Sequence, residues 1–176
     1  MKKRIFACMA ILAFISSVGL TSCSKEDPAN AVDFDSFSLA QGTIEGIAFA
    51  TYDVSSDAPK DQYAPSGTVI FLTVSFNELG INNAFNGETR QLQATVGSGG
   101  KFSFTGIPLN RYNATDVIIS GQPFVKGYIT DGVNDIGEPV LITKSRVFTA
   151  PALPVSIEPG SKEFVTISYS AGELFQ

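Results

Sequence analysis

The chain has 176 residues, which is enough for one domain of ordinary size. Its composition, 44% hydrophobic and 16% charged, is that of a folded protein rather than a disordered one. The net charge is −5, and without a basic patch to hold phosphates no nucleic-acid partner is expected. The absence of histidine excludes Ser-His-Asp and Cys-His catalysis and every zinc site that needs a histidine ligand.

Residues 1–22 are expected to form a signal peptide. A basic start, Met1-Lys2-Lys3-Arg4, precedes an apolar run over residues 5–20, somewhat short for the span of about 20 residues that a membrane helix needs. The run ends in Leu20-Thr21-Ser22-Cys23, which resembles the bacterial lipobox. The resemblance implies that Cys23 receives a diacylglycerol, that the chain is cut before it, and that the new amino group is acylated. The other cysteine, Cys8, falls in the discarded segment.

Residues 23–40 are expected to link this lipid to a domain over residues 41–176. Ser24 fits delivery to the outer membrane, and Lys25-Glu26-Asp27 resembles the lipoprotein surface-export signal of the Bacteroidota. The same cluster also suits a solvated tether. One acyl chain attaches a protein to a membrane only weakly, whereas two or three attach it essentially permanently. The membrane is therefore the expected partner of the lipidated N-terminus at Cys23. The predicted location is the outer membrane, lipid-anchored and exposed at the cell surface.

The domain begins with short strands separated by two long loops. A strand over residues 43–51 contains Gly46, which marks a bulge or a close approach of another chain segment. Loops over residues 53–67 and 77–88 flank the most apolar strand, residues 68–76, which is expected to be central.

Residues 89–105 are expected to form a β-hairpin. Two runs that alternate polar and apolar side chains flank Gly97, Gly99 and Gly100, which can take the positive φ angles of a tight turn. Phe102 and Phe104 fall on the apolar face of the second run, so both are expected in the core rather than in a ligand platform.

The rest of the chain is also expected to form short strands. No helical period longer than about a turn is present, and further strands are expected over residues 116–120, 124–130, 140–149, 153–157 and 163–170. In the last strand, the inward side chains are expected to be Val165, Ile167 and Tyr169. This pattern predicts an all-β fold, an antiparallel β-sandwich of about 7–8 strands.

Three segments resemble the transthyretin-like, or carboxypeptidase regulatory-domain-like, β-sandwich. They are a Gly-bearing first strand at residues 43–49, the entry Ala64-Pro65-Ser66-Gly67-Thr68-Val69, and a Gly-x-Phe-x-Phe strand within residues 99–108. The resemblance covers residues 41–170. It implies the fold, and it implies the non-catalytic roles usual in that family: adhesion, presentation of a partner, or accessory binding.

Candidate sites are few. Tyr52 and Tyr63 bracket the polar loop of residues 53–66, which makes this loop the candidate binding surface, with sugar stacking as one use. Residues 131–138 look like an acidic calcium loop, but Val133 stands where a ligand is needed, so no metal site is predicted. No catalytic residue and no cofactor are predicted, because a serine nucleophile without a base is not a mechanism.

Three functions remain open. The first is a non-catalytic binding or accessory module at the cell surface, with a protein or a glycan as partner. The second is a fimbrial or adhesin-type structural subunit, although fimbrial subunits resemble two such domains in tandem and are cleaved after an Arg near the first strand, whereas the first Arg after Cys23 is Arg90. The third is a glycan-binding lipoprotein, for which the lack of Trp is unfavourable.

Replacing Cys23 with Ala should remove the lipid anchor. We expect the wild-type protein to incorporate radiolabelled palmitate and to partition into the detergent phase, and Cys23→Ala to do neither. A mutant that stays in the detergent phase and still carries the acyl label would contradict the assignment.

Overall fold

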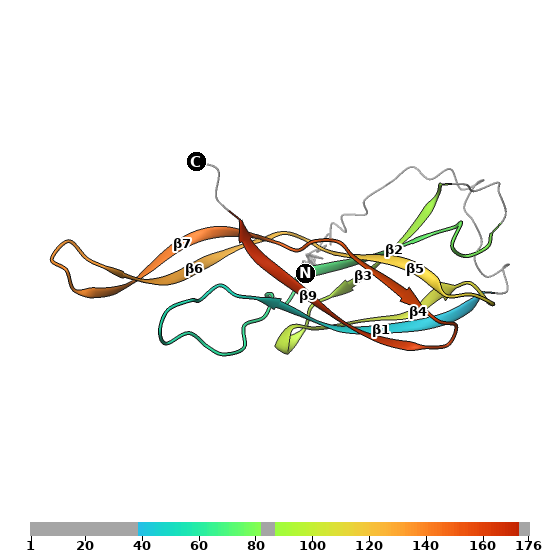
Figure 1. Cartoon of the computed structure of the whole chain (residues 1–176), viewed down its shortest axis with the longest axis horizontal. Coiled ribbons are helices and arrows are strands. Elements are labelled where there is room, and N and C mark those ends of the chain that lie inside the picture. Colours follow the sequence, from blue (N-terminus) through green and yellow to red (C-terminus); the bar gives the residue numbers. More distant parts are fainter. Residues whose placement is uncertain (1–38, 82–86, 173–176) are drawn as a thin grey trace, which may run out of the picture. The chain divides into compact units, whose positions relative to one another are not determined.

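The computed structural model describes residues 39–81 and 87–172 (Figure 1). All of these residues belong to one compact unit within residues 34–176. The predicted signal peptide, Cys23 and nearly all of the linker over residues 23–40 lie outside the described residues.

The described residues form a sandwich of two β-sheets, which confirms the predicted all-β fold. The strands are β1 (Ala40–Ala50), β2 (Val69–Ser75), β3 (Thr89–Thr95), β4 (Lys101–Leu109), β5 (Thr115–Gly121), β6 (Phe124–Val133), β7 (Pro139–Thr149), β8 (Leu153–Ile157) and β9 (Lys162–Gly172). One sheet has the order β4-β1-β9-β7-β6 and the other the order β3-β2-β5-β8. The described ranges therefore hold nine strands rather than about 7–8, and the neighbouring strands β1 and β9 run parallel rather than antiparallel.

β1 lies between two neighbours in its sheet. It pairs with β4 on one side and with β9 on the other, so its backbone groups are used on both sides. Gly46 is the predicted close-approach point: a Cβ there would collide with the ring of Phe102 and come within 2.8 Å of the Val165 carbonyl oxygen. The bulge is elsewhere, at Gly106, which has a φ of 65° opposite the register shift between Gly42 and Thr43.

The predicted hairpin over residues 89–105 is wrong. β3 pairs with β2 in one sheet and β4 pairs with β1 in the other, so the glycine turn carries the chain across the core as an arch. Both strands point apolar side chains at the core, and such alternation is the same in a hairpin and in an arch. The turn itself is as expected, with positive φ at Gly99 and Gly100 and a 2.7 Å hydrogen bond from Gly97 N–H to the Lys101 carbonyl.

The predicted core residues are buried. Phe102 and Phe104 meet edge to face with ring centroids 6.1 Å apart, and Val165, Ile167 and Tyr169 all point inward. Their placement confirms the period-two reading of β4 and β9.

A second aromatic group joins the long hairpin to this core. Phe124 stacks on Phe148 with ring centroids 5.2 Å apart, and its ring lies 4.9 Å from that of Tyr169. The Tyr169 hydroxyl donates to the Gln122 carbonyl at 3.2 Å, and burial raises the pKa of Tyr169 to about 12. Tyr169 therefore stays neutral at physiological pH and acts as a packing group.

The β6–β7 hairpin is only partly incorporated in the sandwich. All ten residues of β6 pair with β7, but β7 pairs with β9 only at Val147, Phe148 and Thr149. The outer part of the hairpin, residues 127–145, therefore extends past the last β7–β9 pair (Figure 1).

The strand directions define two ends of the sandwich. β1 and β9 both start at the end that also carries the turns at residues 110–114 and 158–161; we call this the tether end, since the chain enters the domain there at Leu39. β1 finishes at the opposite end, with residues 51–68, the glycine turn and the outer part of the β6–β7 hairpin; we call this the free end (Figure 1).

Two phenylalanines on opposite faces of the same sheet should differ sharply in their contribution to stability. Phe104 is 3% exposed, so Phe104→Ala should lower the free energy of unfolding by about 3–5 kcal/mol through the cavity it leaves. Phe164 is 63% exposed, so Phe164→Ala should change it by about 0.5 kcal/mol or less. Urea titrations followed by circular dichroism measure both. Equal losses for the two variants would mean that the faces of this sheet are assigned incorrectly.

Candidate functional site

The predicted binding loop at the free end is held together by one buried side chain. Gln62 is 8% exposed, and its Oε1 accepts hydrogen bonds from the backbone N–H groups of Tyr52 and Asp53 at 2.9 and 2.7 Å. Its Nε2 donates to the carbonyls of Asp53 and Pro59. A polar side chain is stable in such a buried place because all of its hydrogen-bonding groups are satisfied. Sequence reasoning missed Gln62, since nothing in a polar loop marks one glutamine as buried.

The two tyrosines that bracket the loop are half-buried. Tyr63 forms an antiparallel bridge with Phe49, and the two rings lie 5.2 Å apart at an angle of 31°. The ring of Tyr52 carries the Lys126 ammonium 3.4 Å from its centroid, a cation–π contact. Tyr52 and Tyr63 thus each have a structural neighbour, and their proposed role in binding stays a prediction.

The same loop also pairs with the β6–β7 hairpin. Ile129 donates its N–H to the Tyr52 carbonyl at 2.7 Å and accepts from the Val54 N–H at 2.9 Å. One step further along the hairpin, the Asp131 carboxylate accepts from the Ser56 N–H at 2.8 Å. The loop and the hairpin therefore form one connected surface at the free end.

The turn of the hairpin is closed by Asn134. Its Oδ1 accepts from the N–H groups of Ile136 and Glu138 at 3.1 and 2.8 Å, and its backbone N–H bonds to the Glu138 carbonyl. The side-chain oxygen that a cation would need is thus engaged by the turn, which gives the acidic segment of residues 131–138 a structural role. In the described ranges, no group of three or more Asp, Glu, Cys or His side chains is placed to hold a metal ion.

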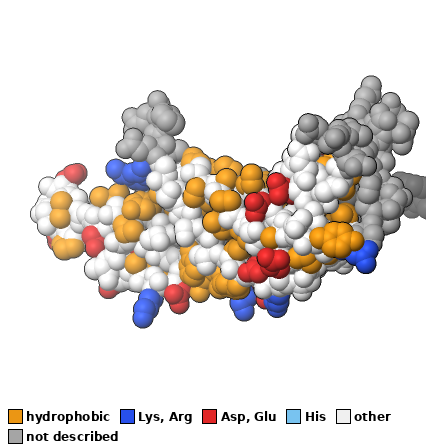
Figure 2. Space-filling view, turned by 45° about the vertical axis from the view of Figure 1, so that its right-hand side comes forward, with side chains coloured by type: hydrophobic (Ala, Val, Ile, Leu, Met, Phe, Trp, Pro, Cys, Tyr) orange, Lys and Arg blue, Asp and Glu red, His pale blue; other side chains and the backbone are white. Residues whose placement is uncertain are grey.

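One face of the hairpin exposes large apolar side chains. Paired residues of β6 and β7 share a face, so Val133 and Leu141 lie on the same side near the turn and are 68% and 63% exposed, while Val125, 66% exposed, is on that side at the far end of β6. Ile136 at the turn is 78% exposed. Figure 2 shows hydrophobic side chains toward the left end of the molecule, which carries the hairpin. Clustered exposed apolar side chains are typical of interaction surfaces.

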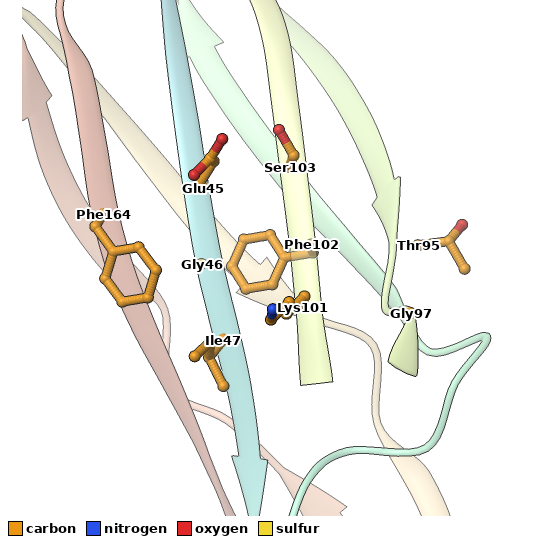
Figure 3. Close-up of a pocket in the computed structure, with 9 residues that line it drawn as sticks. All are labelled: Glu45, Gly46, Ile47, Thr95, Gly97, Lys101, Phe102, Ser103 and Phe164. Atoms are coloured by element: carbon orange, nitrogen blue, oxygen red, sulfur yellow. The ribbon is translucent and has the colours of Figure 1, made fainter. Parts of the chain in front are cut away.

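A second hollow lies on the outer face of the five-stranded sheet, where no site was predicted. It is a groove of about 540 Å³ across β4, β1 and β9 (Figure 3). Its lining residues are Glu45, Gly46, Ile47, Thr95, Gly97, Lys101, Phe102, Ser103 and Phe164. Phe164 could have been found by sequence reasoning, because the alternation of β9 places a large aromatic residue at an outward position.

Charges in this groove are unevenly paired. The Lys162 ammonium lies 2.6 Å from the Glu45 carboxylate, and both side chains are partly exposed. Lys101 lines the groove on β4 and has no ion-pair partner among the described residues. The groove therefore carries one uncompensated positive charge in a chain of net charge −5.

Comparisons add no family assignment: neither a family model nor a curated protein matches this chain. In the described part of the chain, no helix has the length and apolar character needed to cross a membrane.

Removing the buried amide should loosen the loop. Gln62→Ala leaves two N–H groups and two carbonyls without their partner, so we expect a loss of about 1–3 kcal/mol in the free energy of unfolding. Amide hydrogen exchange should also accelerate between residues 52 and 62. The matched control is Gln91→Ala on the exposed side of β3, which should change stability by about 0.5 kcal/mol or less. Unchanged exchange in Gln62→Ala would show that the loop is held by other contacts.

Proposed function

We propose that this protein is a lipid-anchored, non-catalytic β-sandwich module of the outer membrane, exposed at the cell surface, with a binding or accessory role. The lipobox ending at Cys23, the Lys25-Glu26-Asp27 cluster and the sandwich fold support this proposal. The sequence contains no histidine, so a reaction that needs an imidazole base has no residue to supply one.

The observation that carries the proposal is the separation of the two ends of the sandwich. The chain enters the domain at the tether end, next to residues 110–114. The candidate binding loop and the exposed apolar face of the β6–β7 hairpin lie at the free end. The candidate surfaces thus lie at the end of the sandwich opposite the point where the chain enters it, where a partner can reach them.

A structural subunit of a surface assembly is the second candidate function, and the open edge of β7 in the β6–β7 hairpin favours it. Among the described residues, residues 139–146 of β7 pair with β6 but have no strand on their other side. Such an open edge can accept a strand from another chain through backbone hydrogen bonds. A fimbrial or adhesin-type assembly would use the hairpin in this way, whereas an accessory module would use its apolar face.

A protease site in the hairpin turn tests the surface location. With the site inserted between Asp135 and Ile136, protease added to intact cells should cleave the lipid-anchored protein, since this turn is exposed at the free end. Immunoblotting of the cell-bound fragment measures the cleavage.

A second variant carries the same site in the turn of residues 158–161 at the tether end, and it should likewise be cleaved on intact cells if the whole domain is outside. Cleavage of both sites only after the outer membrane is permeabilised would place the domain in the periplasm and would contradict surface exposure.

A further inference from the structure

Side chains of the groove on the outer face of the five-stranded sheet lie in rows that run across its strands. Cross-strand register places Ser103, Glu45 and Phe164 in one row and Lys101, Ile47 and Thr166 in the next. Phe164 and Ile47 thus form an apolar centre on adjacent strands, and hydroxyl and charged side chains surround it (Figure 3). An apolar floor with a few polar groups at its rim is the usual plan of a small-ligand site.

Side chains, not backbone, must recognise the ligand here. β1, in the middle of the groove, is hydrogen-bonded on both sides and offers no free N–H or C=O to a ligand; the open strand edge of this sheet is at the side of the groove, on β4. A single uncompensated lysine is also too little positive charge to hold a nucleic-acid backbone. The groove suits a ligand with one apolar face and a polar edge.

The charge distribution specifies the ligand further. Lys162 pairs with Glu45, which leaves Lys101 as the cation of the groove that can attract a negative group. A pyranose ring that bears a carboxylate has C–H groups that stack on an aromatic face such as Phe164, hydroxyls for Ser103, and an anion for Lys101. We propose that this groove binds an acidic oligosaccharide, with Phe164 as the stacking platform and Lys101 as the carboxylate-binding group.

This inference names a ligand class and is independent of the anchor, because the groove is built only from residues of the sandwich. The test uses the purified full chain in detergent micelles and isothermal titration calorimetry. Three probes are titrated: tetragalacturonic acid, its fully methyl-esterified form, and a tetraglutamate peptide. We expect the acid to bind, the ester to bind at least about tenfold more weakly, and the peptide not to bind.

Variants assign the contacts. Phe164→Ala and Lys101→Gln should each weaken binding of tetragalacturonic acid about tenfold or more, and Lys101→Arg should restore most of it. The controls are Ile118→Ala, an exposed apolar residue of the other sheet, and Arg111→Gln, an exposed cation in the turn of residues 110–114, and both should bind like the wild type.

Four outcomes would overturn the proposal: equal affinity for the acid and its ester, equal affinity for the tetraglutamate peptide, wild-type binding by Phe164→Ala, or no binding of the acid at all. Circular dichroism of each variant confirms that it is folded, so a loss of binding reports on the groove. Failure here leaves the protease result on surface location unaffected, so the two proposals fail separately.

Discussion

The close contact between Gly46 and Phe102 is the constraint on which the sandwich depends. Phe102 fills the space that any other residue at position 46 would occupy, and the Val165 carbonyl of β9 lies on the same side. The contact therefore joins three strands, β4, β1 and β9, at one point of the core. With these strands fixed in register, the outward row of Ser103, Glu45 and Phe164 is fixed as well, so the core contact also shapes the groove on the other face.

Alternation along the chain was sufficient to predict the strands and their buried faces. It placed Phe102, Phe104, Val165, Ile167 and Tyr169 in the core, where the structure has them. It could not decide which strands pair, because residues 89–105 have the same pattern whether the turn joins neighbours in one sheet or crosses between two. The parallel pairing of β1 with β9 was equally hidden, since it joins the two ends of the domain sequence.

The candidate sites were predictable only in part. Tyr52, Tyr63 and the polar loop were selected by composition, which says nothing about internal hydrogen bonds. Gln62 fixes the conformation of that loop through its hydrogen bonds. Its burial depends on the positions of Asp53 and Pro59, which only the folded chain brings together. The groove was missed because its residues come from four strands and the glycine turn, and only Phe164 stands out locally.

The direction of β1 has a mechanical consequence. If the molecule is held at Leu39 and pulled at the free end, the force runs along β1; the hydrogen bonds to antiparallel β4 are perpendicular to it, and those to parallel β9 cross it at a slant. These bonds are then loaded together in shear instead of breaking one after another. The β6–β7 hairpin is joined to β9 by three residue pairs and to the loop by hydrogen bonds at Ile129 and Asp131, so it can instead detach step by step. Under tension the five-stranded sheet would resist unfolding, while the hairpin would yield first. The hairpin would then act as a compliant element between the sandwich and a bound partner.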